Sequence, residues 1–165
     1  MKQIGIFFGS STGDTEKVAT LIRDKIGTDM AAIHDIYESC VDDLGQYPIL
    51  ILGISTWGLG EMQEDWYQFL PRFRSVDFTG KKVALYGVGD QESYPDTFAD
   101  GLGLLYDQLH KNNCKPVGKW PVDGYQFQHS RAERNGQFVG LVLDERNQPE
   151  LTAERINTWL NSLGF

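Results

Sequence analysis

Four hydroxyl residues stand within six positions near the start of the sequence, in the segment Gly9–Thr15 (GSSTGDT). The segment joins a short apolar run to a stretch with helical periodicity, so it leads into a helix N-terminus. Such a terminus carries free N–H groups and about half a unit of positive charge, which favours a bound anion. The hydroxyl groups add hydrogen-bond donors to these amides. The segment therefore predicts a phosphate-binding loop that needs no lysine or arginine.

Other interpretations of Gly9–Thr15 fit less well. An NTPase loop needs a lysine on the outer phosphates, and this segment has none; the G-x-G-x-x-G pattern of dinucleotide sites is also absent. The hydroxyls can instead cap the helix, which is common and physically sound. A cap needs only one hydroxyl, however, and the segment offers four.

Two later segments each place an aromatic residue among glycines and polar residues. They are residues 55–60 (STWGLG) and residues 87–94 (GVGDQESY). Trp57 and Tyr94 offer flat apolar faces on which a planar ring can stack. Either aromatic alone is more often a core residue than a clamp. Together with the hydroxyl-rich segment, the two predict a cofactor site.

The elements that must position these three segments follow from the apolar patterns. Short apolar runs, typical of strands buried on both faces of a parallel sheet, span residues 3–9, 48–55 and 82–89, with weaker runs at 30–35, 114–118 and 138–143. Helical stripes span residues 18–26, 66–73, 98–109 and 156–163. The alternation predicts an α/β fold with an open parallel sheet, in which ligands bind at the carboxyl ends of the strands.

A single domain over residues 1–165 is expected, because a chain of this length suits one hydrophobic core. Residues 119–137 break the rhythm of strands and helices and show no sustained period, so we interpret them as an insertion within or beside the last strand. Cys40 and Cys114 are too few and too widely spaced for a disulfide framework or a metal pattern. We interpret them as packing or surface thiols.

The motifs SSTGDT, STWGLGE and GVGDQESY, in this order, resemble the phosphate loop and the two ring-clasping loops of the flavodoxins, which are FMN electron carriers. The tail HSRAERNGQFVGLVLDERNQPELTAERINTWL resembles the long-chain branch of that family, in which an insertion interrupts the fifth strand. The resemblance covers essentially the whole chain. It implies a three-layer sandwich whose five-stranded parallel sheet has the order 2-1-3-4-5, with FMN at the switch point between strands 1 and 3.

The resemblance also implies which residues bind FMN. Trp57 and Tyr94 are expected to sandwich the isoalloxazine ring. The full set of expected cofactor-binding residues is Ser10, Ser11, Thr12, Gly13, Asp14, Thr15, Ser55, Thr56, Trp57, Gly58, Leu59, Gly60, Val88, Gly89, Asp90, Gln91 and Tyr94. Arg146 departs from the family pattern, because relatives often carry an acid there, so the contact of its segment with the cofactor is left open.

The implied function is that of a low-potential carrier that shuttles single electrons between a reductase and acceptor proteins, without substrate turnover of its own. The family is known for a peptide flip, here at Gly58-Leu59, that favours the one-electron-reduced flavin. Fully reduced flavin tends to be an anion, and a chain of net charge −8 penalises that charge and lowers the potential. No catalytic residue or metal ligand is expected, because the three histidines lie on separate elements.

Two other functions are considered. A flavodoxin-like NAD(P)H:quinone oxidoreductase would need a pocket over the flavin for a second substrate, and a sandwich of two aromatic rings leaves little room for one. A phosphoacceptor signalling domain shares the sheet order but needs acids at the ends of strands 1 and 3, where this chain has Ser10 and Thr56.

The net charge of −8 disfavours nucleic acids and anionic membranes and favours a basic protein partner. By resemblance, that partner is an NADPH-dependent flavodoxin or ferredoxin reductase, docked on an acidic face; an ordinary solvated face is an equally good interpretation of the same acids. These acids are Asp42, Asp43, Glu61, Glu64, Asp65, Asp90, Glu92, Asp96 and Asp100. Without a signal pattern or a run of about 18 apolar residues, the chain is expected to be a cytoplasmic monomer.

Overall fold

The computed structural model describes residues 1–165, and the apolar runs form its parallel strands. These are β1 (Ile4–Gly9), β2 (Ala31–Asp35), β3 (Ile49–Trp57), β5 (Lys82–Val88) and β9 (Leu141–Leu143). The strands lie in the order β2-β1-β3-β5-β9. Since β5 and β9 are the fourth and fifth strands of the parallel sheet, the predicted order is confirmed. The short strand β4 (Glu61–Met62), which pairs antiparallel with the end of β3, was not predicted.

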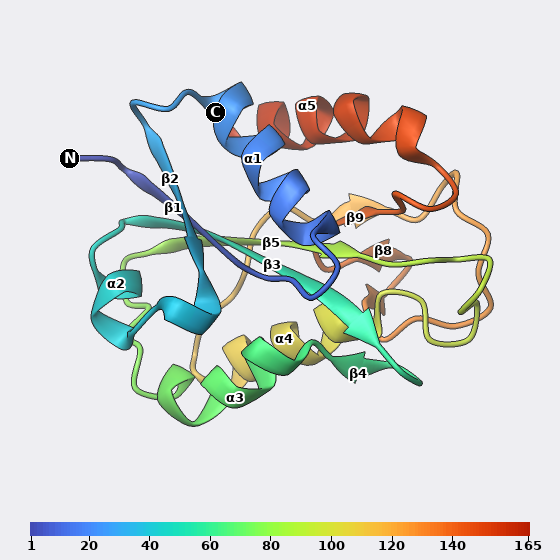
Figure 1. Ribbon diagram of the computed structural model, residues 1–165, viewed down its shortest axis with the longest axis horizontal. Coiled ribbons are helices and arrows are strands. Elements are labelled where there is room, and N and C mark those ends of the chain that lie inside the picture. Colours follow the sequence, from blue (N-terminus) through green and yellow to red (C-terminus); the bar gives the residue numbers. More distant parts are fainter.

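Helices cover both faces of the sheet, as predicted. Figure 1 shows α1 and α5 on one face and α3 and α4 on the other. Their bounds are α1 Asp14–Ile26, α3 Glu64–Phe73, α4 Asp100–Lys111 and α5 Thr152–Leu163. Three short helices were not predicted, namely η1 (Ile36–Glu38), α2 (Val41–Gly45) and η2 (Pro149–Leu151). In none of the helices is an apolar stretch long enough to cross a membrane.

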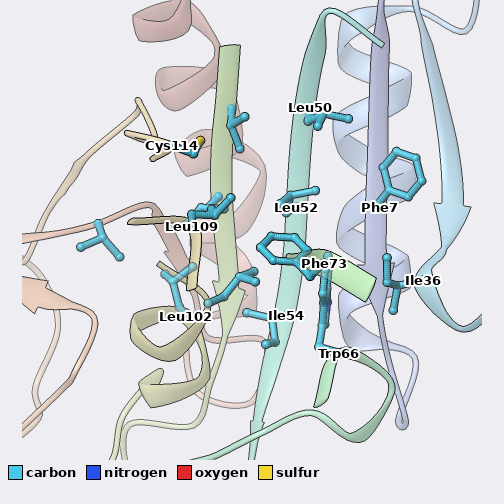
Figure 2. Packing of buried hydrophobic residues seen from close by; sticks show 14 of the residues in the cluster. Phe7, Ile36, Leu50, Leu52, Ile54, Trp66, Phe73, Leu102, Leu109 and Cys114 are labelled. Carbon is cyan, nitrogen blue, oxygen red and sulfur yellow. The ribbon is translucent and has the colours of Figure 1, made fainter. Parts of the chain in front are cut away.

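The strands alternate their side chains between two apolar clusters, one on each face of the sheet. Ile6 of β1 packs in the cluster beneath α1 and α5, whereas its neighbour Phe7 packs in the cluster with Trp66 and Phe73 of α3. Figure 2 shows this second cluster, in which Leu52 and Ile54 of β3 face the aromatic side chains. Burying each such side chain contributes about 1.5–3 kcal/mol, so the continuous apolar runs hold the sheet between its two helical layers.

The fifth strand is split by the predicted insertion. Val117 bridges Ala84 of β5 in parallel, and β9 then pairs with the far end of β5. Between them, the chain forms a separate antiparallel sheet in the order β6-β8-β7. Its strands are β6 (Trp120–Pro121), β7 (Glu133–Arg134) and β8 (Gln137–Phe138). Two-residue strands are too short to produce a sequence period, which is why this sheet was not predicted.

The register of the parallel strands brings the three polar segments to one edge of the sheet. Gly9 at the end of β1 lies beside Ile54 of β3, and Ser55 lies beside Val88 at the end of β5. The hydroxyl-rich segment and the two aromatic segments therefore follow neighbouring strands and leave the sheet at the same edge.

Candidate cofactor site

A cavity of about 260 Å³ lies at this edge of the sheet. It brings together residues from all three predicted segments. From the predicted set, the cavity is lined by Thr12, Asp14, Ser55, Thr56, Trp57, Gly58, Val88, Gly89, Asp90 and Tyr94. Four further residues complete its wall, namely Thr97, Phe98, Ala99 and Arg146.

The hydroxyl-rich segment turns tightly before α1 begins. The Gly13 N–H donates to Ser10 Oγ over 2.8 Å, and Gly13 itself is the N-cap of α1, in a left-handed conformation with φ of 92°. Because a glycine occupies this position, no side chain caps the helix in the usual way. The helix-cap interpretation of the hydroxyls is therefore wrong at the cap position, and the first N–H groups of α1 keep their capacity to bind an anion.

Thr15 provides an independent test of whether an anion fits this loop. Its side chain is only 1% exposed, and its Oγ1 has no hydrogen-bond partner. The residue is held in place because Tyr86 OH donates to the Thr15 carbonyl over 2.9 Å. A buried hydroxyl without a partner costs about 1–3 kcal/mol, so such groups are rare in folded proteins. An unused donor beside the free amides of α1 fits a phosphate group.

The two predicted aromatics are both partly open to solvent on the cavity. Trp57 is 40% exposed and Tyr94 is 50% exposed, although large aromatic side chains are usually buried. Trp57 is oriented by a hydrogen bond of 3.0 Å from its Nε1 to Ser55 Oγ. Gly58, next to Trp57, has a positive φ of 53°, a conformation that other residues adopt only with strain. These features fit a planar ring beside a backbone segment that can change conformation.

A buried carboxylate fixes the loop that carries Tyr94. Asp144, directly after β9, has no solvent exposure and accepts from both the backbone N–H and the side-chain amide of Gln91, at 3.0 and 2.8 Å. Asn147 donates to Asp144 and also to Asp90, each over 2.8 Å. Asp90 in turn accepts from Tyr94 N through its carbonyl, at 3.0 Å. Sequence reasoning missed this network, because nothing local marks Asp144 as its centre.

The insertion supports the same loop from the other side. Gln128 and His129 both donate their backbone N–H to the Pro95 carbonyl, at 2.8 and 3.0 Å. The Phe98 ring packs against Phe127 of the insertion and Phe138 at the end of β8, with ring centroids 5.5 and 6.1 Å apart. Phe98 was predicted only as part of a helical stripe. In the structure it precedes α4 and forms part of the cavity wall, a position that its periodicity could not reveal.

The cavity wall contains charged side chains of both signs. Asp90 is partly buried, which by itself raises the pKa of its carboxyl, but hydrogen bonds from Ser93 and Asn147 outweigh this and hold the pKa below its usual value. Asp14 forms an ion pair of 3.1 Å with Arg146. The cavity thus carries two carboxylates and one guanidinium, and the chain contains no group of side chains suited to a metal ion.

Not every predicted residue reaches the cavity. In the phosphate-loop segment, Ser10, Ser11 and Gly13 lie in the turn before α1 and Thr15 lies in its first turn, but none of them lines the cavity. Leu59, Gly60 and Gln91 do not line it either: Leu59 is exposed, Gly60 is buried and Gln91 donates to Asp144. Their contact with a cofactor stays a prediction. Asp100, one of the acids assigned to a solvated or docking face, is buried instead and accepts from Arg131 N over 2.7 Å. That part of the acidic-face prediction is wrong.

Known proteins match this chain along almost its whole length. The family model described as Flavodoxin matches residues 6–159. A flavodoxin from Nostoc sp. is 48% identical over 162 residues, which cover 98% of this chain and 95% of the relative. The chain belongs to the flavodoxin family. Flavodoxin 1 from Escherichia coli is likewise 48% identical, over 96% of this chain and 91% of its own length.

Solved flavodoxin structures have the same fold. The crystal structure of Fusobacterium nucleatum flavodoxin bound to flavin mononucleotide has a TM-score of 0.92 and 34% identity, covering 99% of this chain and 98% of that one. The predicted flavodoxin-like fold and the family resemblance are thereby confirmed. Flavodoxins are electron carriers rather than enzymes, so the predicted class of function is confirmed as well, and the quinone oxidoreductase alternative is not favoured.

Proposed function

We propose that this flavodoxin binds FMN in the cavity at the carboxyl ends of β1, β3 and β5 and uses it to carry single electrons. One observation supports this above all: the N-terminus of α1, where Thr15 carries a partnerless buried hydroxyl, adjoins a cavity that is lined by two half-exposed aromatic rings. The first feature fits a phosphate and the second a flavin ring. Bound FMN would supply the one-electron chemistry that no side chain of this chain provides.

The residues have distinct tasks in this proposal. The segment Ser10–Thr15 holds the phosphate through backbone N–H groups and hydroxyls. Trp57 and Tyr94 hold the ring between them and keep water from its faces. Gly58 allows the peptide that follows it to present either its N–H or its carbonyl to the ring edge, because its backbone already lies in the region open to glycine.

The charge of the molecule sets the direction of its redox potential. Asp90 in the cavity wall, whose pKa is lowered, and the net charge of −8 would both disfavour added negative charge on a bound cofactor. Bound FMN would therefore be harder to reduce to an anion, and this would make the carrier a strong reductant. This reasoning supports the low-potential function.

The partners are proposed from the same charges. Exposed carboxylates lie on the elements that follow the cavity-lining segments. They are Glu61 of β4, Glu64 of α3, and Glu92 and Asp96 in the loop after β5. A basic NADPH-dependent reductase fits this acidic face and would dock beside the exposed ring edge. We propose that the protein works in the cytoplasm as a monomer that alternates between this reductase and its acceptors.

Titration of the apoprotein with FMN, followed by quenching of flavin fluorescence, tests the binding proposal. Trp57→Leu and Tyr94→Leu are each expected to weaken FMN binding about tenfold, because each loses one stacked aromatic face. Tyr67→Leu is the matched control, since Tyr67 is exposed on α3 and does not line the cavity. A wild-type protein that binds no FMN would contradict the proposal.

Electron transfer is tested with the FMN-loaded protein. Transfer from NADPH to an acceptor such as a cytochrome is expected only when a reductase is added, with a rate that falls steeply as salt screens the acidic face. Oxidation of NADPH by the protein alone would favour the oxidoreductase instead.

A further inference from the structure

Arg146 is the one cationic residue in the cavity wall. Its guanidinium Nη2 lies 3.1 Å from Asp14 Oδ2, and its side chain is 57% exposed. The sequence resemblance left the contact of this segment open. In the structure, the side chain reaches from the turn after β9 across to the N-terminus of α1.

Asp14 stands where a carboxylate conflicts with a bound anion. It is the first residue of α1, it lines the cavity, and it lies between Thr12 and the partnerless Thr15. A carboxylate there gains from the positive end of the helix, but it also repels a phosphate dianion seated on the same amides. The ion pair with Arg146 offsets this repulsion.

The turn that carries Arg146 is held firmly although its side chain is exposed. The backbone N–H of Arg146 donates to Asp144 Oδ1 over 3.1 Å. Glu145 Oε2 lies 2.8 Å from Lys17 Nζ, one turn along α1 from Asp14, and this partner raises the pKa of the Lys17 ammonium. Two adjacent ion pairs thus join the turn to the first turns of α1, so the guanidinium is positioned by the fold and not only by its own flexible chain.

We propose that Arg146 determines specificity for the phosphorylated form of the flavin, by neutralising Asp14 at the phosphate loop. The inference rests on the proposed function, because it takes FMN as the ligand. It assigns Arg146 an effect on the phosphate end of the ligand and none on the ring. Arg146 should therefore matter for FMN and not for riboflavin, which has the same ring and no phosphate.

The test compares the apoproteins of wild type, Arg146→Gln, Asp14→Asn and the double variant, each titrated with FMN and with riboflavin by fluorescence quenching. Arg146→Gln should weaken FMN binding about threefold to tenfold at low salt, since a partly exposed charge has a modest effect. Riboflavin binding should stay unchanged. In the double variant, FMN affinity should return to within about twofold of that of wild type, because no carboxylate is left to neutralise.

Arg23→Gln is the matched control, because Arg23 lies further along α1 and pairs with its neighbour Asp24 at 3.0 Å, away from the cavity. Thermal unfolding of each apoprotein shows whether a variant is folded. The inference would be overturned if Arg146→Gln weakened FMN and riboflavin binding equally, or if it had the same effect on FMN affinity in the wild-type and Asp14→Asn backgrounds. Either result would leave the proposed FMN binding intact. A wild type that binds neither flavin would overturn the proposed function and this inference together.

Discussion

Thr15 is the residue at which we expect effects on stability and effects on cofactor binding to separate most clearly. Its Oγ1 is buried without a hydrogen bond, so the folded apoprotein carries the desolvation cost of a polar group that nothing in the fold satisfies. The neighbouring Ser10 hydroxyl, by contrast, accepts from Gly13 N and stabilises the turn itself. We therefore expect hydroxyls of the same segment to have different roles, which their spacing alone does not reveal.

Thr15→Val should therefore leave the apoprotein as stable as wild type, or up to about 1 kcal/mol more stable, because valine keeps the shape and removes the unsatisfied group. FMN binding should weaken about tenfold, because the phosphate loses a donor. Urea unfolding of the apoprotein and an FMN titration measure the two effects. Thr28→Val, at an exposed position after α1, is the control. A parallel loss of stability and affinity would contradict this division of roles.

At the scale of elements, the site depends on how the ends of β5 and β9 are joined. Asp144 after β9 accepts hydrogen bonds from Gln91, Arg146 and Asn147, and so links the loop that carries Tyr94 to the turn that contacts α1. The insertion closes the other side through the Phe98 cluster. The Tyr94 loop is thus fixed by two segments that follow it by many residues in the sequence.

Asp144→Asn should loosen this junction. Both carboxylate oxygens of Asp144 accept hydrogen bonds from N–H groups, and in asparagine an amide nitrogen, which cannot accept, takes the place of one oxygen. We expect a loss of about 2–3 kcal/mol in the free energy of unfolding, from weakened hydrogen bonds to a buried charge. Faster hydrogen exchange of the amides in residues 90–97 should accompany it. Asp29→Asn, at an exposed position, should change neither quantity. Unaltered exchange in that loop would show that Asp144 is not its anchor.

For the molecule as a whole, we expect the pH dependence of stability to involve one histidine that lies between the first three strands of the sheet. His34 of β2 stacks on Phe7 of β1 with ring centroids 4.7 Å apart, and its Nε2 lies 2.7 Å from Tyr47 OH, just before β3. Partial burial lowers the pKa of His34 below its ordinary value of 6.5; the charge of Asp43 opposes this shift and that of Lys2 adds to it.

This shift predicts how the stability of the apoprotein depends on pH. Well above pH 6.5 the imidazole is neutral in both states, and His34 contributes no pH dependence. As the pH falls below 6.5, the unfolded chain takes up the proton first, so the free energy of unfolding decreases until the folded pKa is passed. His34→Gln should flatten this decrease, which is measured by urea unfolding at stepped pH values. An identical pH profile for His34→Gln and wild type would refute the assignment.

The sequence by itself determined the sheet, the four main helices, the three loops of the site and the place of the insertion. These features follow from apolar periodicity and turn residues, which act over a few neighbouring positions. Only the tertiary structure decided that Arg146 pairs with Asp14, that Asp144 anchors the Tyr94 loop, and that Asp100 is buried. The physical reason is that these contacts join residues far apart in the sequence, and such pairs form only after the strands have fixed which chain segments meet.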